Sequence, residues 1–342
     1  MRFVVHGAGA VGGVVGGRLF QAGHEVVLIA RGAHGAAIAE RGLRVVAPDR
    51  DDTLPVPVVA HPRELAFRDG DVVLLAVKTQ DTPAALRDLA LAASADTPLV
   101  CAQNGVANED LALRHFANVY GMRVVLPALH VEPGVVQAHS APYAGTLDLG
   151  RYPHDPDAAD PTAHAIAEAL RGATFGAEVR PEIMRWKYAK LLLNLSTAVE
   201  ALCGPEGRRN AVQRLALAEG HAVYEAAGIV PLDDPADPPR RERVVDLPVG
   251  GVPRPGGSAF QSLLRGAGSI ETDYINGEVV RLGRLHGVPT PVNEAVHRIA
   301  VRHAVEGRPP GTATVADILA EADAITARRR SGRLTDASAR PS

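Results

Sequence analysis

The stretch that decides the fold of this chain lies near its N-terminus and reads Val4-Val5-His6-Gly7-Ala8-Gly9-Ala10-Val11-Gly12-Gly13. The apolar run that ends at Val5 predicts a buried parallel strand. Apolar positions between Val11 and Leu19 recur with helical periodicity and predict a helix directly afterwards. Strand, glycine turn and helix in this order are the context that the dinucleotide-binding motif G-x-G-x-x-G requires.

Each glycine of the motif has a specific role if the turn binds a dinucleotide. Gly7 permits the tight turn, Gly9 lets the backbone approach a pyrophosphate at the helix N-terminus, and Gly12 lets the helix pack against the strand. We therefore predict cofactor binding by these glycines together with Ala10 and Val11, which lie between them. A glycine-rich turn that binds nothing is the competing interpretation, and the flanking strand and helix disfavour it.

Length and composition narrow the class of protein. A chain of 342 residues suggests two domains, since one core rarely grows past about 250–300 residues. The net charge of -3 gives no reason to expect nucleic acid or a membrane surface as partner. Only two cysteines occur, so we expect a reducing cytoplasm rather than a disulfide scaffold. Because the first strand begins at once, we expect no signal peptide, and because no apolar run is long enough, we expect no membrane span.

The end of the second strand indicates which dinucleotide fits. Residues 25–30 form this strand, and an enzyme that uses NAD usually has Asp or Glu at its end to hold the ribose 2′-hydroxyl. This chain has Arg31 instead, which can pair with a 2′-phosphate through a forked, charged contact. We therefore predict NADP (NADPH) as the cofactor. The alternative is a solvated arginine in a loop.

Two further strands end in polar residues. The apolar strand 71–77 is followed by Lys78, and the strand 99–102 is followed by Gln103 and Asn104. Ligands of open parallel sheets bind at the carboxyl ends of the strands. Lys78 and Asn104 are therefore candidate contacts of cofactor and substrate, although either alone could be an ordinary loop residue.

A long helix over residues 182–202 carries a second pattern. Lys190, Asn194 and Ala198 recur every four residues and share one face, while most other positions are strongly apolar. A lysine on such a helix needs a partner. Lys190 is either the member of a structural ion pair or a catalytic lysine whose ammonium group points into a cleft.

These patterns predict an α/β fold with an N-terminal Rossmann dinucleotide-binding domain and an all-helical C-terminal domain. We place the NADP-binding domain at residues 1–180 and the helical substrate and catalytic domain at 181–328. The tail 329–342 is expected to be disordered. Residues 231–257 form a long segment without periodicity, and a loop of this length inside a domain is usually functional or disordered. No metal site is expected.

Several motifs in order resemble the ketopantoate reductase (2-dehydropantoate 2-reductase) family over most of the chain, except for 231–257 and the end beyond 308. The motifs are Gly7-Ala8-Gly9-Ala10-Val11-Gly12, Ala76-Val77-Lys78-Thr79, Gln103-Asn104-Gly105, Lys190-Leu191-Leu192-Leu193-Asn194, Ser258-Ala259-Phe260-Gln261 and Glu271-Thr272-Asp273-Tyr274-Ile275-Asn276-Gly277. The resemblance implies the reduction of a 2-oxo acid by NADPH, giving pantoate for pantothenate and coenzyme A synthesis.

The resemblance also implies roles for single residues. Lys190 would be the general acid, and Glu271 would position the substrate and Lys190. Lys78 and Asn104 would lie by the nicotinamide and the substrate carboxylate. The residues that would bind substrate oxygens are Asn194 and Ser258.

One departure from the family leaves the substrate open. The family commonly has a second substrate-binding Asn at the position of Ala198. The alternative is a related NADP-dependent dehydrogenase that acts on a bulkier or more apolar 2-oxo acid or an imine. A non-catalytic NADP-binding regulator is a third interpretation, disfavoured because a sensor needs no proton donor. The assembly is also undecided, with a homodimer as one candidate.

Overall fold

The computed structural model describes all residues except 158, 208–209, 233–243, 267 and 339–342, and only the backbone of 331–338. Contacts divide the chain into two compact units. The first, here the dinucleotide unit, comprises Met1–Ala189 and Pro231–Arg254. The second, the helical unit, comprises Lys190–Val230 and Pro255–Ser342.

The dinucleotide unit alternates strands and helices along most of its length. Its strands are β1 (Arg2–His6), β2 (Glu25–Ile29), β3 (Leu43–Ala47), β4 (Arg50–Leu54), β5 (Val58–Val59), β6 (Asp71–Leu75), β7 (Leu99–Cys101), β8 (Val119–Val125), β9 (Ala128–Glu132), β10 (Val135–Ala138), β11 (Gly145–Tyr152) and β12 (Phe175–Gly176). Its helices are α1 (Ala10–Gln21), α2 (Gly32–Arg41), η1 (Pro62–Glu64), η2 (Thr79–Asp81), α3 (Thr82–Ala90), α4 (Asn108–Ala112), α5 (Pro161–Gly172) and the first turns of α6 (Ile183–Cys203).

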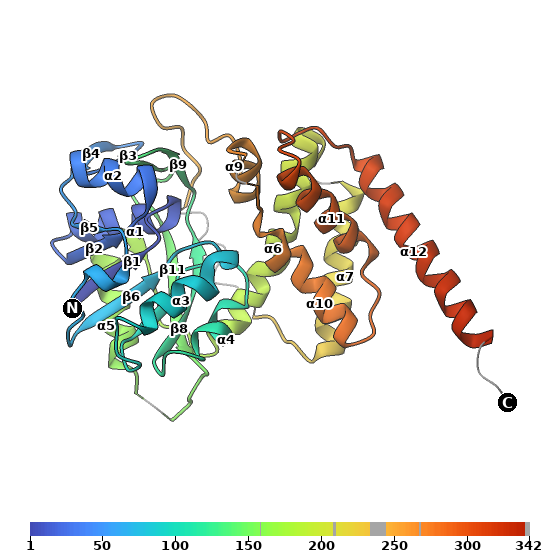
Figure 1. Cartoon of the computed structure of the whole chain (residues 1–342), viewed down its shortest axis with the longest axis horizontal. Coiled ribbons are helices and arrows are strands. Elements are labelled where there is room, and N and C mark those ends of the chain that lie inside the picture. The colour runs from blue at the N-terminus through green and yellow to red at the C-terminus, as the bar shows by residue number, and fades with distance from the viewer. Residues whose placement is uncertain (158, 208–209, 233–243, 267, 339–342) are drawn as a thin grey trace. The chain divides into compact units, whose positions relative to one another are not determined.

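An eight-stranded sheet forms the centre of this unit, in the order β12-β11-β8-β7-β6-β1-β2-β5 (Figure 1). The strands from β8 to β5 are parallel, and β11 pairs antiparallel with β8. The central strands are apolar throughout because both faces are covered. One face packs on α1 and α5, and the other packs on α3 and α4.

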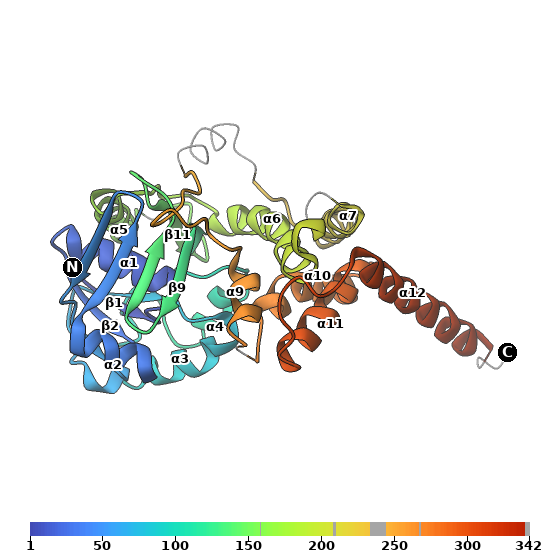
Figure 2. The same cartoon turned by 90° about the horizontal axis from the view of Figure 1, so that it is seen from above.

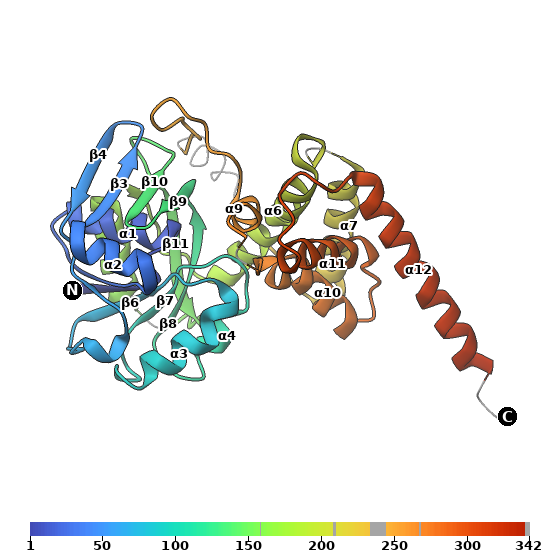
Figure 3. The same ribbon diagram turned by 45° about the horizontal axis from the view of Figure 1, so that its top comes forward.

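Helix α1 lies between this sheet and a second, four-stranded sheet, β4-β3-β10-β9 (Figure 3). Its two glycine pairs, Gly12-Gly13 and Gly16-Gly17, lie one turn apart and allow both sheets to approach. A Cβ atom at Gly16 would lie 2.8 Å from Leu28 of the large sheet, and one at Gly17 would lie 2.6 Å from Val45 of the small sheet. Larger residues would force the layers apart.

The first unit includes two segments that the sequence analysis assigns elsewhere. The boundary predicted at residue 181 lies later, at 189, because the first turns of α6 are held in the dinucleotide unit by the buried ion pair of Lys187 with Glu109. Pro231–Arg254 also returns to this unit. Leu247 N donates to the His139 carbonyl over 2.7 Å. The part of 231–257 at 233–243 lies outside the described residues.

The helical unit contains the rest of α6, η3 (Gly204–Gly207), α7 (Ala211–Ala227), α9 (Ser258–Leu264), η4 (Glu271–Tyr274), α10 (Asn276–Leu285), α11 (Pro291–Val305) and α12 (Val315–Ser338). Its described residues contain no strand. Apolar side chains of α6, α7, α9, α11 and α12 form one core. The predicted fold class, a Rossmann-type α/β domain followed by helices, is confirmed.

Helix α12 packs its first turns on α11, and its C-terminal end extends past the other helices of this unit (Figures 1 and 2). Helix α12 continues to Ser338, so residues 329–338, for which the sequence predicts disorder, are helical. The helix can extend this far because adding residues to an existing helix is easier than starting a new one. Residues 339–342 lie outside the described part. No described helix is long and apolar enough to cross a membrane.

Candidate active site

The glycine loop has the geometry of a phosphate-binding turn. Gly7 has a φ of 102°, and a Cβ atom there would lie 2.7 Å from Val77 N. A Cβ atom at Gly12 would overlap the Gly7 carbonyl oxygen and lie 2.9 Å from Ala76 Cβ. At Gly9, which precedes α1, nothing lies within 4 Å of such an atom. The space above Gly9 and the helix N-terminus fit a pyrophosphate.

A cavity of about 300 Å³ opens beside this loop. It lies at the carboxyl ends of β1, β2, β5 and β6, where open parallel sheets bind their ligands. Its lining residues are His6, Gly7, Ala8, Gly9, Ile29, Ala30, Arg31, His34, Ala60, His61, Pro62, Val77, Asp81, Ala84, Ala85, Asp88 and His130. This lining includes three of the predicted cofactor-binding residues, Gly7, Gly9 and Arg31. Three others, Ala10, Val11 and Gly12, lie in the first turn of α1.

Charged side chains of both signs line this cavity. Arg31 is exposed at the start of α2, and Asp81 and Asp88 lie on the side of η2 and α3. His61 Nε2 lies 3.4 Å from Asp88. His6 is only 7% exposed, and burial, with the nearby charge of Arg31, lowers its pKa from 6.5 to about 4. His6 is therefore neutral at pH 7 in the protein without ligand.

His34, at the start of α2, fixes the glycine loop. Its Nδ1 accepts a hydrogen bond from Gly134 N over 2.9 Å, so its proton lies on Nε2, which donates to the Ala8 carbonyl over 2.7 Å. Burial lowers the pKa of His34, which favours this neutral form. The bond ties the Ala8 carbonyl of the glycine loop to the start of α2. Sequence analysis missed this residue because its partners are distant in the chain.

The loops that carry Lys78 and Asn104 are tied together. The Gln103 amide donates to the Val77 carbonyl over 2.7 Å and to Thr82 Oγ1 over 2.8 Å. Asn108 donates to the Asn104 carbonyl over 3.2 Å. The two loops follow neighbouring strands, β6 and β7. Lys78 and Asn104 therefore lie on one rim of the sheet, as the strand ends predict.

A buried ion pair lies behind this rim. Lys187 Nζ donates to Glu109 Oε1 and, over 3.2 Å, to the Gln103 carbonyl. Burial raises the pKa of Glu109, while the charge and hydrogen bond of Lys187 oppose this shift. Lys187, three residues before Lys190 on α6, thus forms a buried structural ion pair, and the catalytic role of Lys190 stays a prediction.

The remaining predicted residues belong to the helical unit. Lys190 and Asn194 are half-buried on α6, and Ala198, one turn further, is 2% exposed and belongs to the apolar core. Ser258 is exposed at the first position of α9, and Glu271 is half-buried at the first position of η4. The lysine and asparagine therefore precede the point where this face of α6 enters the core.

A buried polar network joins η4 to α6 and α11. Asn276 Nδ2 donates to the Leu195 carbonyl over 3.3 Å and to Asn293 Oδ1 over 3.0 Å. Asn276 also accepts from Thr272 Oγ1 over 3.3 Å. Part of the motif 271–277 is thus structural, and it fixes Glu271 relative to the segment of α6 that carries Asn194.

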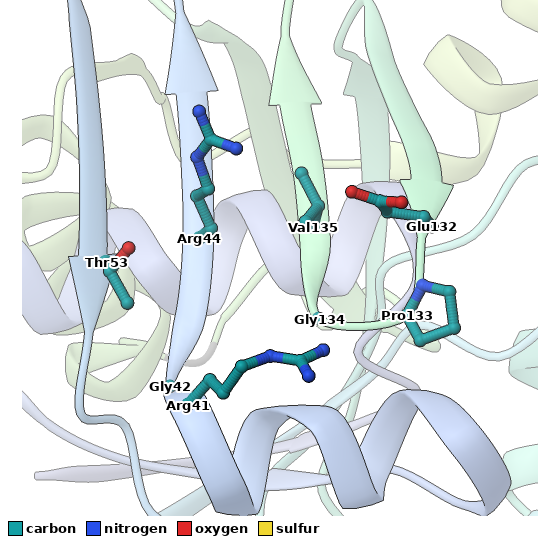
Figure 4. A pocket seen from close by; sticks show the side chains of 8 residues that line it. All are labelled: Arg41, Gly42, Arg44, Thr53, Glu132, Pro133, Gly134 and Val135. Carbon is teal, nitrogen blue, oxygen red and sulfur yellow. The ribbon is translucent and has the colours of Figure 1, made fainter.

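A second hollow, of about 410 Å³, lies on the small sheet beside the end of α2. Figure 4 shows Arg41 extending below the strands toward Pro133 and Gly134. Arg44 is already paired with Asp51 through bonds of 2.8 and 2.5 Å, and Arg41 lies 3.3 Å from Glu40. The cavity at the glycine loop is the better candidate for a cofactor, because four strand ends and the helix N-terminus converge there.

Arg31 is predicted from the sequence, whereas the cavity's other titratable residues are not. The signal that could have found His61 is its position two residues beyond β5, matching that of Arg31 beyond β2. Although histidines and aspartates gather in this cavity, the described residues contain no group of three or more His, Cys, Asp or Glu arranged to hold a metal ion.

Comparison with known proteins agrees with this arrangement. The family model "Ketopantoate reductase PanE/ApbA" matches residues 3–154, and the model of the C-terminal part of that family matches 182–304. The 2-dehydropantoate 2-reductase of Halobacterium salinarum is 30% identical over 306 residues, covering 85% of this chain and 95% of the relative.

Solved structures are similar as well. A crystal structure of a PanE/ApbA family ketopantoate reductase from Ralstonia eutropha JMP134 has a TM-score of 0.75 and 31% identity, and the match covers 90% of this chain and 100% of that one. A D-mandelate dehydrogenase solved with NADH, at 24% identity, a TM-score of 0.73 and coverage of 90% and 99%, shares the fold. The chain belongs to the ketopantoate reductase family of NAD(P)-dependent oxidoreductases.

Proposed function

We propose that this protein reduces 2-dehydropantoate (ketopantoate) to pantoate with NADPH, in pantothenate and coenzyme A synthesis. The observation that carries the proposal is the cavity at the glycine loop, where Gly9 leaves room for a pyrophosphate and Arg31 stands in place of an acidic residue. The family's 2-dehydropantoate 2-reductases, such as that of Halobacterium salinarum, support the choice of substrate.

Arg31 supports NADPH over NADH. A 2′-phosphate carries up to two negative charges and would be repelled by an acid at the end of β2, whereas a guanidinium can bind it through two parallel N–H bonds. Arg31 is exposed at the cavity and begins α2, so its side chain is available to a ligand. The bound nicotinamide would supply the hydride that reduces the substrate.

Lys190 is the proposed proton donor. As hydride adds to C2 of the 2-oxo acid, the carbonyl bond opens and negative charge develops on its oxygen. The Lys190 ammonium group donates a proton to that oxygen, which completes the 2-hydroxy acid. Its place on α6, half-buried and at the edge of the apolar core, keeps a charged lysine near solvent while limiting its freedom.

The other residues bind and orient. Glu271 positions the substrate and Lys190, and the network through Asn276 fixes η4 for this purpose. Asn194 and Ser258 donate hydrogen bonds to substrate oxygens. Lys78 and Asn104, held on one rim of the sheet, bind next to the nicotinamide and the substrate carboxylate.

The test is NADPH oxidation with ketopantoate and a panel of more apolar 2-oxo acids, each repeated with NADH. We expect the highest kcat/KM with NADPH and ketopantoate. Arg31→Ala should weaken NADPH use about ten- to a hundred-fold, the value of a lost charged hydrogen bond, and leave NADH kinetics almost unchanged. A wild type that prefers NADH would refute the cofactor proposal.

The same panel decides the alternative substrate class. That alternative depends on Ala198, whose side chain packs in the core of the helical unit. If a bulkier 2-oxo acid is reduced with higher kcat/KM than ketopantoate, the alternative holds.

The cellular location and the assembly are separate proposals. The buried free thiols of Cys101 and Cys203 support a location in the reducing cytoplasm. Static light scattering would test a homodimer.

A further inference from the structure

We propose that His6 and His61 complete, with Arg31, one subsite that binds the 2′-phosphate of the dinucleotide, and that a proton enters the cavity with this phosphate. The inference rests on the proposed use of NADPH. It assigns the discrimination between the two nicotinamide dinucleotides to three side chains from three neighbouring strand ends rather than to the arginine alone.

Strand register places these side chains together. His6 ends β1 and pairs with Ile29 of β2, which in turn pairs with Val59 of β5. Arg31 and His61 each follow two residues after these paired positions. The ladder continues beyond the strand, because Ala30 N donates to the Val59 carbonyl over 3.0 Å. Arg31 and His61 therefore lie next to each other at the sheet edge, and all three residues line the same cavity.

His6 is a buried polar side chain whose hydrogen bonding is incomplete. It is a polar side chain at the wall of the cavity and is only 7% exposed. Within the described part of the chain, its Nδ1 atom has no hydrogen-bond partner. Buried polar atoms are nearly always paired, because an unpaired one loses its bonds to water without compensation. A ligand oxygen in the cavity would satisfy it.

His61 can donate into the same space. Its Nδ1 accepts a hydrogen bond from Arg63 N over 3.2 Å, which leaves the proton of the neutral ring on Nε2. That atom lies 3.4 Å from Asp88, longer than a good hydrogen bond. A phosphate oxygen at ordinary hydrogen-bond distance would therefore offer this N–H a stronger acceptor than Asp88 does.

The charges of the cavity require a proton when the phosphate binds. Arg31 contributes one positive charge, and Asp81 and Asp88 contribute two negative charges, while burial lowers the pKa of His6 and of His34 and so favours their neutral forms. A phosphate dianion would add to this repulsion unless a histidine or the phosphate itself takes up a proton. The charged and titratable groups that line the cavity are His6, Arg31, His34, His61, Asp81, Asp88 and His130.

The test compares NADPH and NADH binding to the whole protein in calorimetric titrations at pH 7, in two buffers of different ionisation enthalpy. We expect NADPH, but not NADH, to take up a proton. The variants are His61→Gln and His6→Asn. The matched control is His164→Gln, which changes an exposed histidine on α5 outside the cavity. Each cavity variant should raise the Kd of NADPH about tenfold or more, as expected for a lost charged hydrogen bond.

NADH binding should be unchanged in all variants, which also shows that they fold. If His6→Asn does not fold, the half-buried His61 still tests the subsite. Equal losses of NADPH and NADH would mean that the histidines serve the adenosine or the loop, and would overturn the inference. A wild type that prefers NADPH, with no proton uptake and unchanged selectivity in the variants, overturns the inference alone. A wild type that prefers NADH overturns the proposed cofactor and this subsite together.

Discussion

A single methyl group at Gly9 should separate cofactor binding from folding. Gly9 has a φ of -68°, which alanine adopts without strain, and no atom lies within 4 Å of the added Cβ. Gly9→Ala should therefore fold normally, and the lower entropy of its unfolded chain should even stabilise it by about 0.4–1 kcal/mol. The same methyl group occupies the space where the pyrophosphate approaches the loop.

The expected loss is that of one charged hydrogen bond from the loop, about 1.5–3 kcal/mol, which raises the Kd of NADPH roughly ten- to a hundred-fold. Fluorescence titration measures this Kd, and thermal unfolding of the protein without ligand measures stability.

The matched control is Gly12→Ala, where the same methyl group would overlap the Gly7 carbonyl oxygen. Overpacking of this kind costs about 1–3 kcal/mol and should lower Tm by roughly 2–12 °C in a domain of this size. Normal NADPH binding by Gly9→Ala, or an unfolding temperature lowered as much as that of Gly12→Ala, would refute the assignment of the loop.

Three further predictions concern chemistry and stability. Lys190→Ala should lower kcat roughly 10²–10⁴-fold while NADPH binding survives, and near-normal turnover would contradict its role as proton donor. Lys187→Met should lower the free energy of unfolding by about 3–5 kcal/mol, because it leaves Glu109 buried without its cation; urea unfolding measures this, and the double variant with Glu109→Leu should recover most of the loss. Neutral His6 contributes stability above pH 6.5 that is lost as the pH falls toward 4, about 3 kcal/mol in all, so His6→Asn should show a shallower fall in unfolding free energy over this range than the wild type.

The Rossmann-type part of the fold follows from local patterns. Parallel strands buried on both faces appear as apolar runs, and the glycine motif marks the first crossover. The small sheet is harder to predict, because β3 pairs with β10 from the other half of the unit. Only the doubled glycines of α1 indicate that this helix has two close neighbours, and the sequence analysis used Gly12 alone.

The site could be predicted where a residue follows a strand or recurs on a helix. Arg31, Lys78 and Asn104 lie at strand ends as expected, and their roles stay predictions. Burial was not predictable for the two lysines of α6. The burial of Lys187 depends on its pairing with Glu109, which lies far away in the sequence.

The motif 271–277 shows how one run of residues serves two purposes. Asn276, the first residue of α10, is buried; it donates to the carbonyl of Leu195, the residue after Asn194 on α6, and accepts a hydrogen bond from Thr272 of η4. Glu271 begins η4 and is half-buried. A buried amide network therefore links the short helix that carries the proposed carboxylate to the part of α6 that carries the proposed substrate amide. A buried network of this kind is rigid because breaking any bond leaves a polar group unpaired. The buried part of the motif, Thr272 and Asn276, thus helps to hold the proposed positioning residue Glu271 in a fixed place.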